Sequence, residues 1–129
     1  MELVFDSTKV FEEELHGLQR KEQTSLVVKL NSTAQFLLDD CDLFYRSVFR
    51  PHRIMLRGGL ESTLYVLRAG RDLRVIMTVD EDPIFGQIVI TLLRVVRHKE
   101  LDKVYRGLAE SIYREWNAYI LEEEGDCEA

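Results

Sequence analysis

The N-terminal part of the chain changes its hydrophobic spacing twice. Residues 1–6 alternate loosely between apolar and polar side chains, which predicts a short strand. Hydrophobic side chains then recur every three or four positions, which predicts an amphipathic helix over residues 8–19 with Asp6 or Ser7 as its N-cap. The same spacing predicts a second helix over residues 21–42. Two helices joined so closely predict an antiparallel helical hairpin.

The middle of the chain changes to a period of two. Residues 43–52 are ambiguous, because their aromatic side chains can prolong the preceding helix while Pro51 restricts Arg50 to extended backbone. Beyond them, glycine, aspartate and proline separate short segments with strand-like alternation. We expect four consecutive strands, over residues 53–57, 64–68, 72–79 and 87–96. The last of these is the most hydrophobic, which predicts a central place in the sheet.

Helical spacing returns after Lys99 and ends before an acidic C-terminal segment. We therefore expect a long C-terminal helix and an acidic, disordered tail over residues 122–129. The order of strand, two helices, four strands and helix predicts a single α+β domain over residues 1–121. In this fold the N-terminal strand and the helical hairpin pack on a mainly antiparallel, twisted sheet, with the helices on one side.

Length and composition exclude several classes of protein. A chain of 129 residues, 46% hydrophobic and 31% charged, is typical of one soluble globular domain. It has no run of 18 apolar residues to cross a membrane, and its N-terminus lacks the pattern of a usual secretory signal. Cys41 and Cys127 form no CxxC pair, so neither a disulfide framework nor a zinc ribbon is expected. We therefore expect a cytoplasmic protein.

Charge is distributed unevenly along the chain, although its net value is −6. Residues 44–106 carry 12 basic and 7 acidic side chains, whereas the segments before and after them are both net acidic. Ten of the twelve bases are arginines, whose planar guanidinium suits bidentate binding of phosphate. Two interpretations stay open: the segment binds a phosphate-bearing ligand, or it is a solvated sheet surface paired with the acidic first helices.

Conventional active-site motifs do not occur in the sequence. There is no GxGxxG motif, no Walker loop and no GxSxG elbow, and neither cysteine has the sequence signature of a nucleophile. His16, His52 and His98 have no partner at the spacing of a metal site. We therefore expect neither a metal nor a cofactor.

Polar side chains nevertheless gather near the ends of the predicted strands, where a rigid frame commonly projects functional groups. Arg74 lies among apolar neighbours in mid-strand, and because its burial is costly we expect it to face an open surface or a cleft. Structural interpretations compete, such as an ion pair between Arg68 and Asp72 or a Tyr105 hydroxyl that merely reaches water. The candidate residues are Arg57, Arg68, Arg71, Arg74, Arg97, His98, Lys99 and Tyr105.

Several of these candidates fall in a string that resembles the RelE/ParE toxin superfamily. The string comprises residues 56–58 (LRG), 64–76 (LYVLRAGRDLRVI), 98–100 (HKE) and 104–106 (VYR). In that superfamily an LKG turn precedes a hairpin of the form lYxLRaGrdyRviy, and an HxxevY segment closes the sheet. The N-terminal strand and helical hairpin fit as well, so the likeness covers most of residues 1–110. It implies a small α+β toxin of a type II toxin–antitoxin module.

The resemblance also implies roles for individual side chains. RelE-type members cut messenger RNA, typically in the ribosomal A site, by attack of a 2′-hydroxyl on the neighbouring phosphate, and this needs no metal. By its match to the superfamily's hairpin arginines, Arg74 would hold the scissile phosphate and Arg68 would support it. His98 or Lys99 would act as a proton donor or a further cation, and Tyr105 would stack on a base or assist proton transfer. The other candidates for binding RNA phosphates are Arg57, Arg71 and Arg97.

The chain departs from the RelE pattern in ways that keep alternatives open. Leu64 and Val66 stand where RelE carries lysines, which leaves His98 as the only candidate general base. The ParE branch, whose members poison DNA gyrase without being nucleases, is the alternative, as is a degenerate member that acts only by binding protein. Both the RelE and the ParE type imply a cognate antitoxin that wraps over the toxin and folds on binding. Messenger RNA and the ribosome are partners of the RelE type alone.

Overall fold

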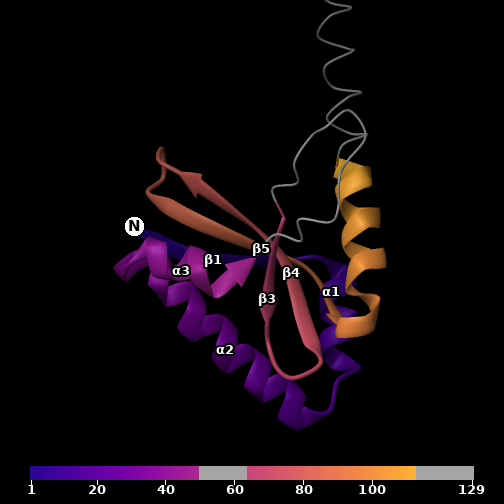
Figure 1. Cartoon of the computed structure of the whole chain (residues 1–129). Coiled ribbons are helices and arrows are strands. Elements are labelled where there is room, and N and C mark those ends of the chain that lie inside the picture. The colour runs from indigo at the N-terminus through magenta and orange to yellow at the C-terminus, as the bar shows by residue number, and fades with distance from the viewer. Residues whose placement is uncertain (50–63, 113–129) are drawn as a thin grey trace, which may run out of the picture.

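The computed structural model describes residues 1–49 and 64–112, which form a five-stranded sheet with helices packed on it (Figure 1). The strands are β1 (Glu2–Ser7), β2 (Val48–Phe49), β3 (Tyr65–Arg68), β4 (Leu73–Asp82) and β5 (Gln87–Arg97). Their order in the sheet is β1-β5-β4-β3-β2. β1 pairs with β5 in parallel, and the other pairings among these strands are antiparallel. The prediction of an α+β fold with a mainly antiparallel sheet is confirmed.

Three helices lie between β1 and β2, namely α1 (Lys9–His16), α2 (Arg20–Asp39) and α3 (Cys41–Ser47). Thr8 caps α1, because its hydroxyl oxygen accepts a hydrogen bond from the amide of Phe11 at 3.1 Å. The predicted caps, Asp6 and Ser7, still belong to β1, so that prediction is wrong by one or two residues. None of the helices in the described ranges is long and apolar enough to span a membrane.

The predicted helix over residues 21–42 is divided at Asp40. This residue has extended backbone, and its carboxylate accepts a hydrogen bond from the amide of Leu43, so that it caps α3. The ambiguous segment that follows is helical as far as Ser47, after which Val48 and Phe49 pair with β3. The strand predicted over residues 53–57 and the tail over 122–129 lie outside the described residues.

The longest strands of the sheet are β4 and β5. β5 lies between β1 and β4, so it is an interior strand as its hydrophobicity predicts, but the middle position belongs to β4. β4 continues three residues beyond its predicted end at Val79, because Asp80, Glu81 and Asp82 still pair with the start of β5. A turn over residues 83–86 connects the two strands, and within it Gly86 has a φ of +63°.

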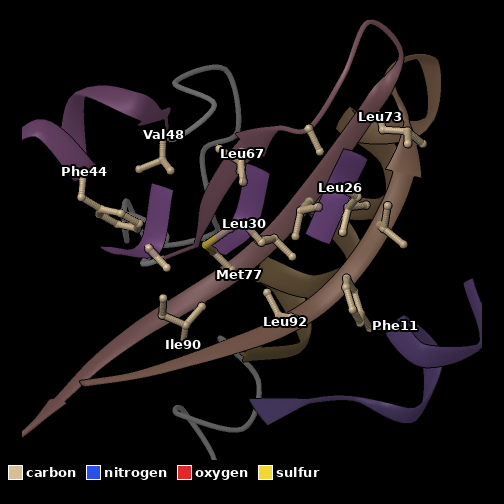
Figure 2. Close-up of a cluster of buried hydrophobic side chains, with 14 of the residues drawn as sticks. Phe11, Leu26, Leu30, Phe44, Val48, Leu67, Leu73, Met77, Ile90 and Leu92 are labelled. Carbon is tan, nitrogen blue, oxygen red and sulfur yellow. The ribbon is translucent and has the colours of Figure 1, made fainter. Parts of the chain in front are cut away.

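Both faces of the sheet are covered, so the expectation that the helices lie on one side is wrong. Figure 2 shows the core on one face, where Phe11, Leu26, Leu30 and Phe44 of the helices lie against strand residues such as Met77. On the other face the helical residues 101–112 pack through a second cluster. This cluster comprises Leu64, Val66, Ile76, Val96, Leu101, Tyr105 and Ala109. The physical reason is the run of apolar side chains in β4, which is typical of a strand buried on both faces.

Candidate functional site

The turn between β3 and β4 places two arginines side by side. The amide of Ala69 donates a hydrogen bond to the carbonyl of Leu73 at 3.0 Å and so closes the turn. In the resulting register Arg68 is directly opposite Arg74. Because opposed residues of antiparallel strands project from the same face of a sheet, the two side chains start out as neighbours. We call Arg68 and Arg74 the arginine pair.

Arg74 is the buried member of this pair, with 6% of its surface exposed. Its Nη1 donates hydrogen bonds to the carbonyls of Gly70 at 3.1 Å and Leu73 at 2.9 Å, so the side chain braces the turn from within. Burial, and after it the positive charge of Arg68, lowers the pKa of the Arg74 guanidinium, while the charge of Asp72 opposes this effect. Of the two expected positions for Arg74, an open surface or a cleft, the open surface is wrong, because backbone carbonyls compensate the burial of its side chain.

The arginines of β5 are instead neutralised by carboxylates of the helices. Arg97 binds Glu22 of α2 through Nη1 at 2.6 Å and Nη2 at 3.2 Å. Arg94 binds Glu14 of α1 through Nε at 2.8 Å and Nη2 at 2.9 Å. The hydrogen bond with Arg97 lowers the pKa of Glu22, and each carboxylate raises the pKa of its arginine. Arg97 is opposite Leu73, a residue of the α2-side core, so it lies on the other face of the sheet from the arginine pair.

His98 and Lys99 belong to a 3₁₀ turn, η2 (His98–Glu100), that follows β5 directly. The amide of His98 donates to the carbonyl of Asp72 at 2.7 Å and lies 3.2 Å from the Asp72 carboxylate oxygen Oδ1. Since Asp72 follows Arg71 in the β3–β4 turn, these bonds fasten η2 to that turn. The side chains of Arg71, His98 and Lys99 are all exposed at this end of the sheet.

Tyr105 lies within the helical residues 101–112 and has only 1% of its surface exposed. Its ring belongs to the core between this helix and the sheet, and its hydroxyl donates a hydrogen bond to the carbonyl of Leu64 at 3.2 Å. In this arrangement the hydroxyl is not accessible to a ligand. The roles that the resemblance implies for Tyr105, stacking on a base or assisting proton transfer, therefore stay predictions, and both require the helix to move.

A hollow of about 640 Å³ lies between α2 and the β3–β4 turn, and we call it the α2 hollow. Ser25, Lys29 and Ser32 line it from α2, and Arg68 and Arg71 line it from the turn. No pattern in the sequence singled out the three α2 residues. Their helical spacing marks them as one stripe of the helix, but only the fold shows that this stripe faces a cationic turn.

The structure thus divides the candidates that the sequence suggested. Arg68, Arg71 and Arg74 gather at the β3–β4 turn with η2 beside them, whereas Arg97 lies on the other face and Tyr105 in the core. Arg57 lies outside the described residues. Within residues 1–49 and 64–112, no three His, Cys, Asp or Glu side chains are grouped closely enough to hold a metal ion. What the turn offers chemically is a set of guanidinium groups suited to anionic ligands.

The comparisons with known proteins show a likeness in structure. No protein-family model and no curated protein sequence matches the chain. Among solved structures, the chain is similar to the crystal structure of the toxin–antitoxin complex RelBE2 from Mycobacterium tuberculosis. The two chains are 17% identical with a TM-score of 0.46, and the match covers 75% of this chain and 99% of that one.

Proposed function

We propose that this protein is the toxin of a type II toxin–antitoxin module and that it binds RNA through the β3–β4 turn. The observation that carries the proposal is the gathering of three arginines in this turn, within the segment LRAGRDLR by which the chain resembles the RelE/ParE superfamily. In the part of the chain that the structure describes, Arg68 and Arg71 make no ion pair, in contrast with Arg94 and Arg97 of β5. Exposed guanidinium groups without a carboxylate partner suit phosphate.

The reaction that we favour is of the RelE type. The 2′-hydroxyl of a ribose attacks the neighbouring phosphorus, the P–O5′ bond breaks, and the hydroxyl proton must be removed while the 5′-oxygen gains one. Negative charge grows on the phosphate in the transition state, and the arginine pair supplies positive charge beside it. Histidine is the side chain that most readily exchanges protons near neutral pH, and His98 lies next to the turn. Lys99 supplies a further cation.

The covered face of the sheet determines how RNA approaches. Arg74 lies opposite Val96, and the cluster that includes Val96 is packed beneath the helical residues 101–112. Arg68 and Arg71 are exposed at the end of the sheet. We therefore place the first phosphate contact at these two exposed arginines. Arg74 binds the same phosphate when its hydrogen bonds to the carbonyls of Gly70 and Leu73 break, or when the helix over residues 101–112 shifts.

A cognate antitoxin is the partner that this function requires. α2 exposes the apolar side chains of Val27, Val28 and Leu38, and β1 forms one edge of the sheet. A segment that folds on binding can cover such side chains or add a strand to such an edge. Co-purification of the protein with the product of an adjacent small reading frame tests this partner.

Translation of a defined message in a cell-free system tests the RNA-cleaving function. Primer extension maps breaks in the message after purified protein is added. We expect breaks with the wild type and a loss of cleavage on the order of 10²-fold with Arg68→Ala, because one charged group at the reacting phosphate is removed. Arg46→Ala, which removes an exposed arginine of α3, is the matched control and should cut as the wild type does. A message that stays intact with the wild type contradicts this function.

One observation favours the ParE type as a second candidate. Arg74 Nη1 and the Tyr105 hydroxyl already donate to backbone carbonyls, so neither group is directed at a ligand. A protein of this kind would stall DNA gyrase and leave messages intact. A gyrase supercoiling assay run beside the translation assay separates the two functions.

A further inference from the structure

The α2 hollow gathers positive charge without any carboxylate in its described lining. Lys29, Arg68 and Arg71 line it, and none of them makes an ion pair within residues 1–49 and 64–112. On β5, by contrast, Glu14 and Glu22 each neutralise an arginine. The fold thus supplies carboxylates to some of its arginines and leaves the hollow cationic, in a chain whose net charge is −6.

Such a hollow is suited to an anionic occupant. Its volume of about 640 Å³ is in the range of ligand sites in proteins, roughly 300–1,000 Å³. Three cationic side chains around one hollow, with no carboxylate in its described lining, attract anions to it. The hydroxyls of Ser25 and Ser32 add groups that can donate to phosphate oxygens; Ser32 now donates to the carbonyl of Lys29 at 3.2 Å within the helix.

We propose that the α2 hollow binds backbone phosphates of single-stranded RNA adjacent to the phosphate held at the arginine pair. Arg68 belongs to both the pair and the hollow, so one strand can pass around the β3–β4 turn from the sheet to α2. None of the described residues that line the hollow is aromatic, so it contacts phosphates and does not stack on bases. Binding in the hollow is therefore independent of base sequence. The proposal rests on the proposed function, because it extends the path of the same RNA.

Lys29→Ala tests the hollow without altering the arginine pair. The probe is a fluorescein-labelled, single-stranded RNA with 2′-O-methyl riboses, which cannot be cleaved by 2′-hydroxyl attack. Its dissociation constant is measured by fluorescence anisotropy at several salt concentrations. One lost phosphate contact reduces the steepness of the plot of log affinity against log salt by about 0.7. Between 1 M and 0.1 M salt, the affinity of Lys29→Ala therefore increases about fivefold less than the affinity of the wild type.

Two further variants make the outcome unambiguous. Lys21→Ala removes another exposed lysine of α2 that does not line the hollow, and both its affinity and its salt slope should equal those of the wild type. Ser25→Glu places a negative charge in the lining and should weaken binding at least as much as Lys29→Ala. Equal salt slopes for Lys29→Ala and the wild type overturn the proposal. Binding of an acidic peptide such as polyglutamate in place of the RNA overturns it as well.

Failure of the proposed function gives a different result. In that case the wild type leaves messages intact during translation, whereas Lys29→Ala still lowers the salt slope for the modified RNA. If the wild type cuts messages and Lys29→Ala binds RNA like the wild type, the function stands and only the hollow is wrong.

Discussion

Replacing Tyr105 by phenylalanine separates a structural from a catalytic role of its hydroxyl. The ring keeps its packing in the core, and the change removes the hydrogen bond donated to the carbonyl of Leu64 at 3.2 Å. A buried neutral hydrogen bond stabilises a fold by about 0.5–1.5 kcal/mol net. For a domain of this size, a loss of about 1 kcal/mol lowers the midpoint of thermal unfolding by roughly 3–5 °C.

Thermal unfolding followed by circular dichroism measures this change, and the translation assay at 25 °C measures activity on the same samples. Tyr45→Phe is the matched control: Tyr45 is 42% exposed, so its variant should stay within about 0.5 kcal/mol of the wild type. We expect Tyr105→Phe to lose stability and to cut the message at 25 °C to the same extent as the wild type. An unchanged midpoint together with abolished activity would refute the assignment of this hydroxyl to the core.

Two other substitutions test local features of the fold. Gly86→Ala imposes a side chain on a backbone with a φ of +63°, so denaturant unfolding should show a free energy of unfolding lower by about 1 kcal/mol. Gly70→Ala is the control: Gly70 has open space around it and no positive φ, so the free energy of unfolding should change little. Glu22→Gln removes a carboxylate whose pKa Arg97 holds below its ordinary value of 4.5. That carboxylate stabilises the fold above this value and loses the effect as pH falls through its lower folded pKa. The variant should therefore lose less stability than the wild type on acidification. Identical acid-unfolding curves of the two proteins contradict the pairing.

Spacing along the chain predicted the elements that depend on near neighbours. β1, α1 and the β3–β4 hairpin lie within a few residues of their predicted positions. The break at Asp40 was missed, because a side-chain cap interrupts an otherwise continuous helical pattern. The cover on the second face was also missed. It depends on the packing of Tyr105 and Ala109 in one cluster with Ile76 and Val96, and packing between such distant segments is not visible in local periodicity.

The sequence suggested which residue types gather near the strand ends, but not how their side chains are arranged. An arginine in mid-strand is expected at a surface, yet Arg74 is buried because the turn presents two carbonyls to it. The partner of Arg97 is 75 residues away in sequence, so its neutralisation by Glu22 could not be inferred from the local pattern. The contribution of Lys29 likewise depends on α2 lying beside the turn.

The central claim is that exposed guanidinium groups of the β3–β4 turn act on RNA. Primer extension on a translated message with the wild type, Arg68→Ala and Arg68→Lys tests it most directly, with thermal unfolding run on each sample. We predict that the wild type cuts the message and that Arg68→Ala cuts it on the order of 10²-fold more slowly. Arg68→Lys should restore part of the cleavage, because lysine keeps the charge and loses the bidentate geometry. Cleavage by Arg68→Ala at the wild-type rate, or no cleavage by the folded wild type, would contradict the claim.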